Sequence, residues 1–302
     1  MDAQLTFKKY LDFSQFPRDW RVCRAAVDWQ GSPLLLVDEG KPPYPSGDAS
    51  TEARIRWFNA LPSARHLVYW DGASQTTLTL DKSAGIGSFQ VQRFGEGWLL
   101  GGGRGGRTDV CDNKGRLQRT LDLGDAGNDV QTTSDGHIWV SYSDEEVFGG
   151  GVGQHGVVCF DSAGRAIFKY SEFADQNQLP PIDDCYAMNV VNAEEVWLSY
   201  YSDFPLVSIK NFQLNGAWEN FGCMNPAFAI LGETVISQKC YTRVEGKSQL
   251  LRRSISAPAQ TEPAHAIDEK GVVIDGLFTS IAKGPNFYVL TDTALYELQR
   301  NR

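Results

Sequence analysis

Acidic side chains recur at one kind of position in this sequence, where an apolar, strand-like segment ends. Asp38-Glu39, Asp144-Glu145-Glu146, Asp203 and Asp292 each follow such a segment. Carboxylate and amide oxygens are the ligands that Ca²⁺ prefers, and a bound cation can polarise a carbonyl group or activate water. If the fold brings such residues together, they predict a metal site. Its candidate ligands, which leave or enter strand-like segments, are Glu39, Asn128, Asp129, Asp183, Asp184 and Asp275.

The same acidic pattern has two other interpretations. An Asp at the end of a strand commonly accepts hydrogen bonds from loop N–H groups and fixes the turn. Alternatively, an acidic rim with aromatic neighbours is a surface that could bind a basic partner, since large aromatic side chains are enriched at interfaces. The candidate partner-binding residues are Asp144, Glu145, Glu146, Phe148, Tyr200, Tyr201, Asp203 and Phe204.

Motifs for catalysis are scarce. The sequence contains no G-x-S-x-G, no H-E-x-x-H and no P-loop, and its four histidines share no motif spacing. His155 lies in a glycine-rich segment and is the one histidine that we keep as a candidate general base. No catalytic residue is otherwise predicted, and no cofactor is expected unless the metal site exists.

Two segments match G-x-G-x-x-G literally, at Gly101–Gly106 and Gly151–Gly156. A dinucleotide fingerprint must follow a strand and open a helix. Here strand-like runs follow, beginning at Asp109 and Val157, so we expect glycine loops and no nucleotide site.

The elements that must position these residues form a repeat. A short apolar strand, a tight polar turn and a second strand rich in Trp, Leu, Val or Tyr recur with turns near positions 31, 96, 135, 194, 232 and 285. Asp135-Gly136 is the strongest of these hairpin turn signals. A second hairpin follows, most clearly at Cys111 and Cys159, where Asp-x-x-Gly-Arg comes next. Two hairpins in each repeat predict a four-stranded antiparallel sheet.

Sheets of this kind bury their faces by stacking around an axis, so the pattern predicts an all-β, six-bladed β-propeller formed by one domain over residues 1–302. The last repeat is one strand short at Leu295–Leu298, and Leu5–Tyr10 is expected to supply that strand and close the ring. A seventh blade within residues 40–67 is the alternative count, although the proline-rich run from Lys41 indicates a loop. A pair of β-sandwiches is the alternative fold. Residues 51–60 are the only helix-like segment.

The run from Thr132 to Val140, with its Asp-Gly turn followed by Ile-Trp-Val, resembles the repeat of bacterial propellers of the NHL-like, streptogramin-lyase-like and sensor kinds. The resemblance extends over Asp129 to Arg165 and implies the fold. Such families include lactonases, lyases and binding scaffolds. The lactonase ligands, a Glu on the first blade with Asn and Asp from later blades, would correspond by order to Glu39, Asn128, Asp183 or Asp184, and Asp275.

Charge and cysteine content indicate which partners and which cellular compartment to expect. The net charge of −9 argues against nucleic acids and anionic membranes as partners, since both need a basic footprint. The first residues lack the long apolar run of a secretory signal, and no cysteines form a C-x-x-C pair. We therefore expect a cytoplasmic monomer whose six cysteines are free thiols.

Two functions are weighed. The first is a non-catalytic scaffold that binds a protein or peptide partner, basic in character, at its acidic face; a neutraliser of a basic bacterial toxin would fit this description. The second is a Ca²⁺-assisted lactonase, another hydrolase or a lyase at the mouth of the channel, with His155 as base. The lack of a nucleophile–base pair favours the first.

Overall fold

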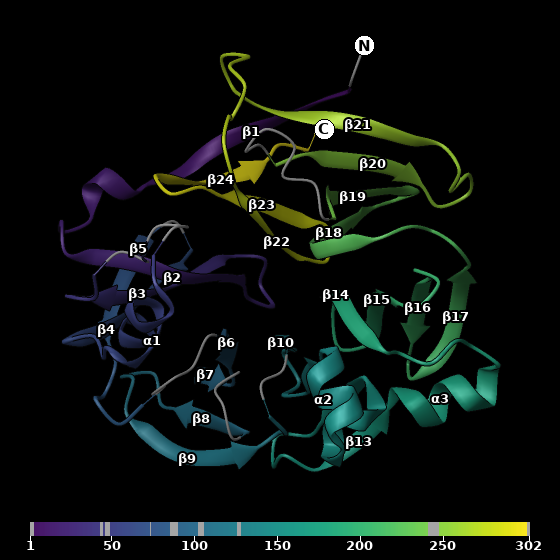
Figure 1. Ribbon diagram of the computed structural model, residues 1–302, viewed down its shortest axis with the longest axis horizontal. Coiled ribbons are helices and arrows are strands. Elements are labelled where there is room, and N and C mark those ends of the chain that lie inside the picture. The colour runs from purple at the N-terminus through teal and green to yellow at the C-terminus, as the bar shows by residue number, and fades with distance from the viewer. Residues whose placement is uncertain are drawn as a thin grey trace.

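The fold is described from a computed structural model, which covers residues 3–42, 45, 49–72, 74–84, 90–101, 106–125, 128–240 and 248–300. Strands dominate these residues, and they pair into antiparallel meanders of four strands, here called blades 1 to 6 in chain order (Figure 1). Blade 1 contains β2 (Trp20–Val27), β3 (Pro33–Glu39), β4 (Ala64–Asp71) and β5 (Ser74–Thr79). Blade 2 contains β6 (Gln90–Phe94), β7 (Gly97–Gly101), β8 (Arg107–Cys111) and β9 (Leu117–Asp122).

The other blades repeat this order. Blade 3 contains β10 (Asp129–Thr132), β11 (Ile138–Ser141), β12 (Val157–Phe160) and β13 (Ala166–Lys169). Blade 4 contains β14 (Asp184–Val190), β15 (Glu195–Tyr201), β16 (Leu206–Lys210) and β17 (Gln213–Trp218). Blade 5 contains β18 (Met224–Leu231), β19 (Thr234–Lys239), β20 (Leu250–Ser254) and β21 (Thr261–Asp268). Blade 6 contains β22 (Thr279–Lys283), β23 (Asn286–Leu290), β24 (Ala294–Leu298) and β1 (Ala3–Asp12).

The N-terminal strand closes the ring, as the sequence predicts. β1 pairs antiparallel with β24, so it supplies the fourth strand of blade 6. It also pairs in parallel with β21, which joins blades 5 and 6 into one eight-stranded sheet. Phe7 in the middle of β1 is fully buried, so the two ends of the chain share one core.

The blades are held together by cores that lie between them, and this excludes a pair of sandwiches. Each of six clusters of buried side chains draws on two consecutive blades, and the last of them joins blade 6 to blade 1. Trp98, Trp139 and Trp197 are buried in three of these clusters, as expected for recurrent aromatic positions. Trp29 differs, because it lies half-buried in the turn between β2 and β3.

Polar side chains connect different blades. The side-chain amide of Gln131 on β10 donates to the carbonyl of Met188 on β14, at 2.8 Å. Asn189 on β14 donates to the carbonyls of Phe228 and Gly284, at 2.7 and 2.9 Å. Buried amides with partners on other blades restrain the blades relative to one another.

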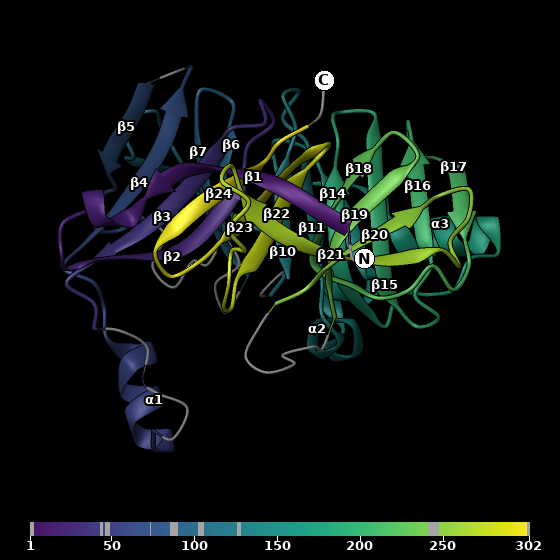
Figure 2. The same cartoon turned by 90° about the horizontal axis from the view of Figure 1, so that it is seen from above.

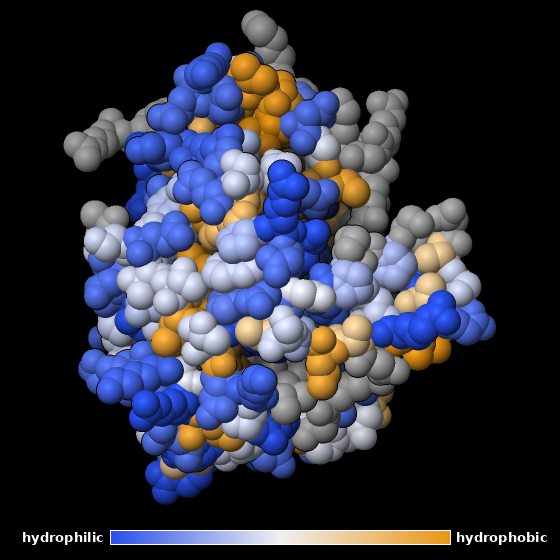
Figure 3. All heavy atoms as spheres, turned by 90° about the vertical axis from the view of Figure 1, so that its left-hand side faces the viewer, coloured by the Kyte–Doolittle hydropathy of each residue, from blue (hydrophilic) through white to orange (hydrophobic). Residues whose placement is uncertain are grey.

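In the described ranges, three helices and two short 3-10 segments interrupt the strands. Only α1 (Thr51–Asn59) was expected; α2 (Asp144–Gly149) and α3 (Tyr170–Asn177) were not. The 3-10 segments are η1 (Phe13–Gln15) and η2 (Gly151–His155). α1 occupies the segment where a seventh blade was considered; Pro43 and Tyr44 of the proline-rich run lie outside the described residues. α1 and α2 project from the same face of the ring (Figure 2). In the space-filling view the insertion that carries α1 stands out from the body, and its surface contains both hydrophilic and hydrophobic residues (Figure 3).

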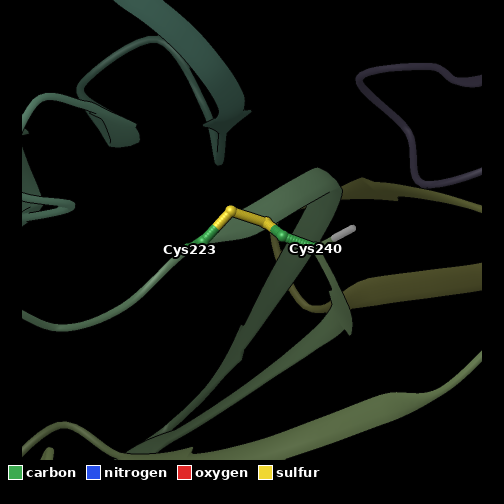
Figure 4. Close-up of a disulfide and its surroundings, with 2 residues drawn as sticks. All are labelled: Cys223 and Cys240. Atoms are coloured by element: carbon green, nitrogen blue, oxygen red, sulfur yellow. A yellow bond between two sulfur atoms is a disulfide. The ribbon is translucent and has the colours of Figure 1, made fainter. Parts of the chain in front are cut away.

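The expectation of six free cysteines is wrong. Cys223, just before β18, and Cys240, just after β19, form a disulfide with Cα atoms 5.9 Å apart (Figure 4). Antiparallel pairing places the start of β18 beside the end of β19, with Met224 opposite Lys239. The two cysteines are neighbours in the sheet although they are 17 positions apart in the sequence.

Candidate functional site

The face from which α1 and α2 project is here called the mouth face. The first strand of each blade begins there and the second strand ends there, so the acidic residues of the sequence analysis lie on this side of the ring. Over blades 3 and 4 they combine with aromatic side chains in a surface that we call the acidic-aromatic rim. It consists of Asp144, Glu145, Glu146, Phe148, Asp183, Asp184, Tyr186, Tyr201, Asp203 and Phe204.

Helix α2 forms one side of the rim. Ser143 precedes the helix, and the Glu146 carboxylate accepts from its backbone N–H at 3.1 Å and from its hydroxyl, which makes a capping box. Asp144 and Glu145 also occupy the first turn, where carboxylates interact favourably with the positive end of the helix dipole. Glu146 is thus half-buried and engaged in capping, while Asp144 and Glu145 are exposed.

Gly153 in η2 fixes the position of α2. This glycine is buried, and a Cβ atom added to it would lie 2.8 Å from Glu146 Cβ. The second G-x-G-x-x-G segment is therefore a packed 3-10 turn before β12, not the glycine loop that was expected. Of the first such segment, residues 102–105 lie outside the described residues.

Strands β14 and β15 form the other side of the rim. Asp184, the first residue of β14, is paired with Tyr201, the last residue of β15. The rings of Tyr186, Tyr201 and Phe204 make a cluster with centroids 5.6 to 6.5 Å apart. Asp203 and Phe204 both have positive φ angles, 62° and 47°, a backbone conformation that is uncommon for residues other than glycine and that turns the chain back over the cluster.

The electrostatics of the rim centre on Asp184. The side-chain amide of Asn128 donates to Asp184 Oδ1 at 3.3 Å and to the Cys185 carbonyl at 3.1 Å. Burial, and then the charges of Asp144 and Glu146, raise the pKa of Asp184 to about 6, against the lowering effect of the Asn128 bond. The carboxylates of α2 and β14 are thus close enough to repel one another, which makes the rim a place where a cation would be stabilised.

Two aromatic side chains of the rim are open to solvent. Phe148 is 74% exposed and Tyr201 is 46% exposed. Tyr200 was also expected to contact a partner, but it is fully buried, with its hydroxyl 2.5 Å from that of Tyr170 and 3.1 Å from the Pro180 carbonyl. The reason is strand alternation: Tyr200 and Tyr201 point to opposite faces of β15, and Tyr200 packs in the core between blades 3 and 4.

The candidate metal ligands are not gathered into one site. Among the described residues, no three His, Cys, Asp or Glu side chains are placed to hold a metal ion. Glu39 instead accepts from Ser63 and lies 2.8 Å from His66 Nε2 in blade 1. Asp129 accepts from Gln131 at 2.8 Å and lies 3.6 Å from the Arg24 guanidinium.

The remaining candidate ligands lie at strand entrances. Asp183 donates its backbone N–H to the Tyr201 carbonyl at 2.9 Å. Asp275, before β22, accepts from the Gly276 N–H at 3.0 Å, as a turn-fixing carboxylate does. Within the proposed ligand set, Asn128 and Asp184 are hydrogen-bonded to each other.

His155 lies on the outer side of blade 3. Its Nδ1 is 2.6 Å from the Ser171 hydroxyl of α3. Burial and the charge of Lys169 lower its pKa, which disfavours the protonated ring. The charged groups that influence its pKa are Lys169 and Glu172, which do not belong to the acidic-aromatic rim.

Sequence reasoning missed Tyr186. In the structure, Asp184 and Tyr186 at the start of β14 are half-buried, and Cys185 between them is buried. The sequence signal was the spacing of Asp184 and Tyr186. Two residues on the same side of a strand share one surface, so an acidic residue two positions before a tyrosine at a strand entrance indicated that both face the rim.

Four-stranded meanders arranged in a ring, with cores between consecutive blades and closure through the N-terminal strand, define the protein as a β-propeller. The YxzG family model matches residues 157–298, from blade 3 to blade 6. No curated protein matches the chain.

Several solved structures are similar to this chain. A streptogramin B lyase structure shares 9% sequence identity over 98% of each chain, with a TM-score of 0.49. A structure of YCF48 bound to D1 peptide shares 10% identity over 100% of this chain and 96% of that one, with a TM-score of 0.45. Hydrazine synthase of Kuenenia stuttgartiensis shares 8% identity over 93% of this chain and 76% of that one, with a TM-score of 0.47.

None of the helices in the described ranges has the length and apolar character needed to cross a lipid bilayer.

Proposed function

We propose that the protein is a non-catalytic scaffold whose acidic-aromatic rim binds a basic segment of a protein or peptide partner. The observation that carries this proposal is the position of Asp184, which lies among Asp144 and Glu146 and is paired along the sheet with Tyr201 of the aromatic cluster. A cation at this place gains attraction from the carboxylates and contact with ring faces. Arg and Lys side chains satisfy both conditions.

Exposure and rigidity support the same function. Phe148 and Tyr201 present apolar area to solvent, and large exposed aromatic side chains are common anchors in interfaces. The rim stands on α2, held by its capping box and Gly153, and on two strands of a closed sheet. A rigid surface loses little conformational entropy when a partner binds.

The test uses the full chain and a short dye-labelled peptide in which Arg and Gly alternate, with fluorescence anisotropy as the readout. The double variant Asp144→Asn with Glu145→Gln is expected to raise the Kd roughly tenfold, about 1.4 kcal/mol, by removing two exposed charges. Tyr201→Leu keeps apolar bulk but removes the ring, and it is expected to weaken binding as well.

The matched control changes the same number of charges elsewhere. Glu194 and Glu233 are exposed in the β14–β15 and β18–β19 turns, on the face opposite the mouth. Glu194→Gln with Glu233→Gln should leave the Kd unchanged. Equal weakening in both double variants would mean that only net charge matters, and the proposal would then be wrong.

A further inference from the structure

A large groove occupies the other half of the mouth face. It has a volume of about 1800 Å³ and is lined by the starts of β2, β18 and β22, the ends of β3, β19 and β23, and the segment from Asp12 to Arg18. Sites for drug-sized ligands are roughly 300–1000 Å³. This groove therefore has room for a segment of polypeptide.

The groove is cationic in a chain of net charge −9. Its ionisable lining comprises five cations and three carboxylates, 5 − 3 = +2, if cysteine is counted as neutral. Two of the carboxylates already have cationic partners: Asp38 lies 2.9 Å from Arg65, and Asp12 lies 3.0 Å from Lys9. The four other cations of the lining are Arg18, Arg21, Lys41 and Lys239, and the third carboxylate is Asp292.

Two of these cations are held by contacts within the protein. Arg21 Nη1 donates to the carbonyls of Arg18 and Trp20 at 2.7 and 2.8 Å, which uses one nitrogen of a group with five N–H donors. Lys41 Nζ lies 3.9 Å from the centroid of the Trp57 ring of α1. Their charges are therefore positioned before any ligand arrives.

A row of rings forms one wall. Phe13 stacks on Phe16 with centroids 5.6 Å apart, and Phe16 contacts Trp20 at the same distance. Trp20 in turn stacks on His66 at 4.2 Å. Leu277, 47% exposed, adds apolar surface from the segment that enters β22.

We propose that this groove is a second binding site, which takes an extended acidic peptide segment that also carries aromatic or aliphatic side chains. Its carboxylates would pair with Arg18, Arg21 and Lys41, and its apolar side chains would lie on Phe16, Trp20 and Leu277. A nucleic acid strand is less favoured, because it carries a charge on every phosphate whereas the groove retains Asp292 and offers apolar side chains as well as cations. The site is independent of the acidic-aromatic rim, which has the opposite charge.

The test measures anisotropy of a short dye-labelled peptide in which Glu and Tyr alternate, with the full chain. Binding is expected in the wild-type protein, and Arg18→Gln with Arg21→Gln is expected to weaken it roughly tenfold. Lys41→Gln, just after β3 and beside the segment that carries Arg18, should weaken it as well. Thermal unfolding of each variant shows whether the fold is intact.

The control changes two cations on the opposite face. Lys114 and Arg116 are exposed in the β8–β9 turn, and Lys114→Gln with Arg116→Gln should leave binding unchanged. The Arg–Gly peptide, which tests the rim, should not compete with the Glu–Tyr peptide for the groove. The inference is overturned if the Glu–Tyr peptide does not bind, if folded Arg18 and Arg21 variants bind it as wild type does, or if oligothymidylate binds the groove more tightly.

Discussion

The side-chain amide of Asn128 donates a hydrogen bond to the Asp184 carboxylate, at 3.3 Å, and so joins the entrance of blade 3 to the entrance of blade 4. This bond favours the ionised form of Asp184, but burial and the neighbouring Asp144 and Glu146 outweigh it, and the pKa of Asp184 rises to about 6. An ionised carboxylate in such a position lowers the stability of the free protein and favours the binding of a cationic ligand. The acidic-aromatic rim is built around this residue.

Asp184→Asn is expected to stabilise the protein at pH 7.5 and to have little effect at pH 4. The folded-state pKa of about 6 lies above the unfolded value of 3.8, so the folded protein binds more protons between these values and its stability falls as pH rises through them. The gain at pH 7.5 is modest, because Asp184 is only half-buried and solvent screens its charge. Urea unfolding at the two pH values measures it. An equal change at both would show that the variant acts through packing.

Lys283→Met is expected to stabilise the protein most at pH 6 to 7. Lys283 is buried at the end of β22, and burial lowers its pKa to about 7 despite the attraction of Asp129 and Asp28. At this position the unfolded chain then binds more protons between pH 7 and 10.5, so the contribution of Lys283 to stability rises with pH across that window, by up to about 1.4 kcal/mol per pH unit. Below pH 7 the full cost of burying the charge is present.

The pH profile of unfolding separates this effect from a gain in packing. The difference in stability between Lys283→Met and the wild type should shrink between pH 7 and 10, whereas the difference for Lys114→Met, at an exposed turn, should stay constant. A difference between Lys283→Met and the wild type that stays constant over this range contradicts the expected titration of Lys283.

Tyr200→Phe is expected to lower stability by about 1–2 kcal/mol and to leave binding of the Arg–Gly peptide unchanged. The buried hydroxyl of Tyr200 bonds to Tyr170 and to the Pro180 carbonyl, so its removal leaves buried polar groups without their partner. Chemical unfolding and anisotropy check the two parts. Loss of binding in a stable Tyr200→Phe protein would place Tyr200 in the rim after all.

Phe7→Ala is expected to lower stability by about 3–5 kcal/mol, as for other large buried aromatic side chains. Phe7 lies in β1, which completes blade 6, and packs with Phe287 at a centroid distance of 6.4 Å. Thermal unfolding measures the loss. Lys8→Ala, on the exposed side of the same strand, is the control and should change stability little.

The fold could be predicted because its signals are local. A hairpin such as that around Asp135-Gly136 needs only its own turn residues, and the missing last strand is evident from counting hairpins. The six cores confirm the ring, and β1 confirms its closure. α2 could not be predicted from periodicity, since it spans six residues and depends on a capping box.

The candidate site was harder to predict, because the side chains that contact its residues come from other strands. Asp38 and Glu39 belong to the predicted acidic set, but β4 brings Arg65 and His66 beside them. Those partners lie 27 positions away, where spacing carries no information about charge. As a result the mouth face is acidic over blades 3 and 4 and cationic over blades 5, 6 and 1.

The most direct test of the central claim is a map of where a basic ligand touches the protein. Backbone amide shifts of the ¹⁵N-labelled full chain would be followed as the Arg–Gly peptide is added. We expect the largest changes at residues 143–148, 183–186 and 201–204, with the β14–β15 turn near Glu194 unaffected. Changes centred on the opposite face, or spread evenly over all acidic turns, would contradict the assignment of the rim as the binding surface.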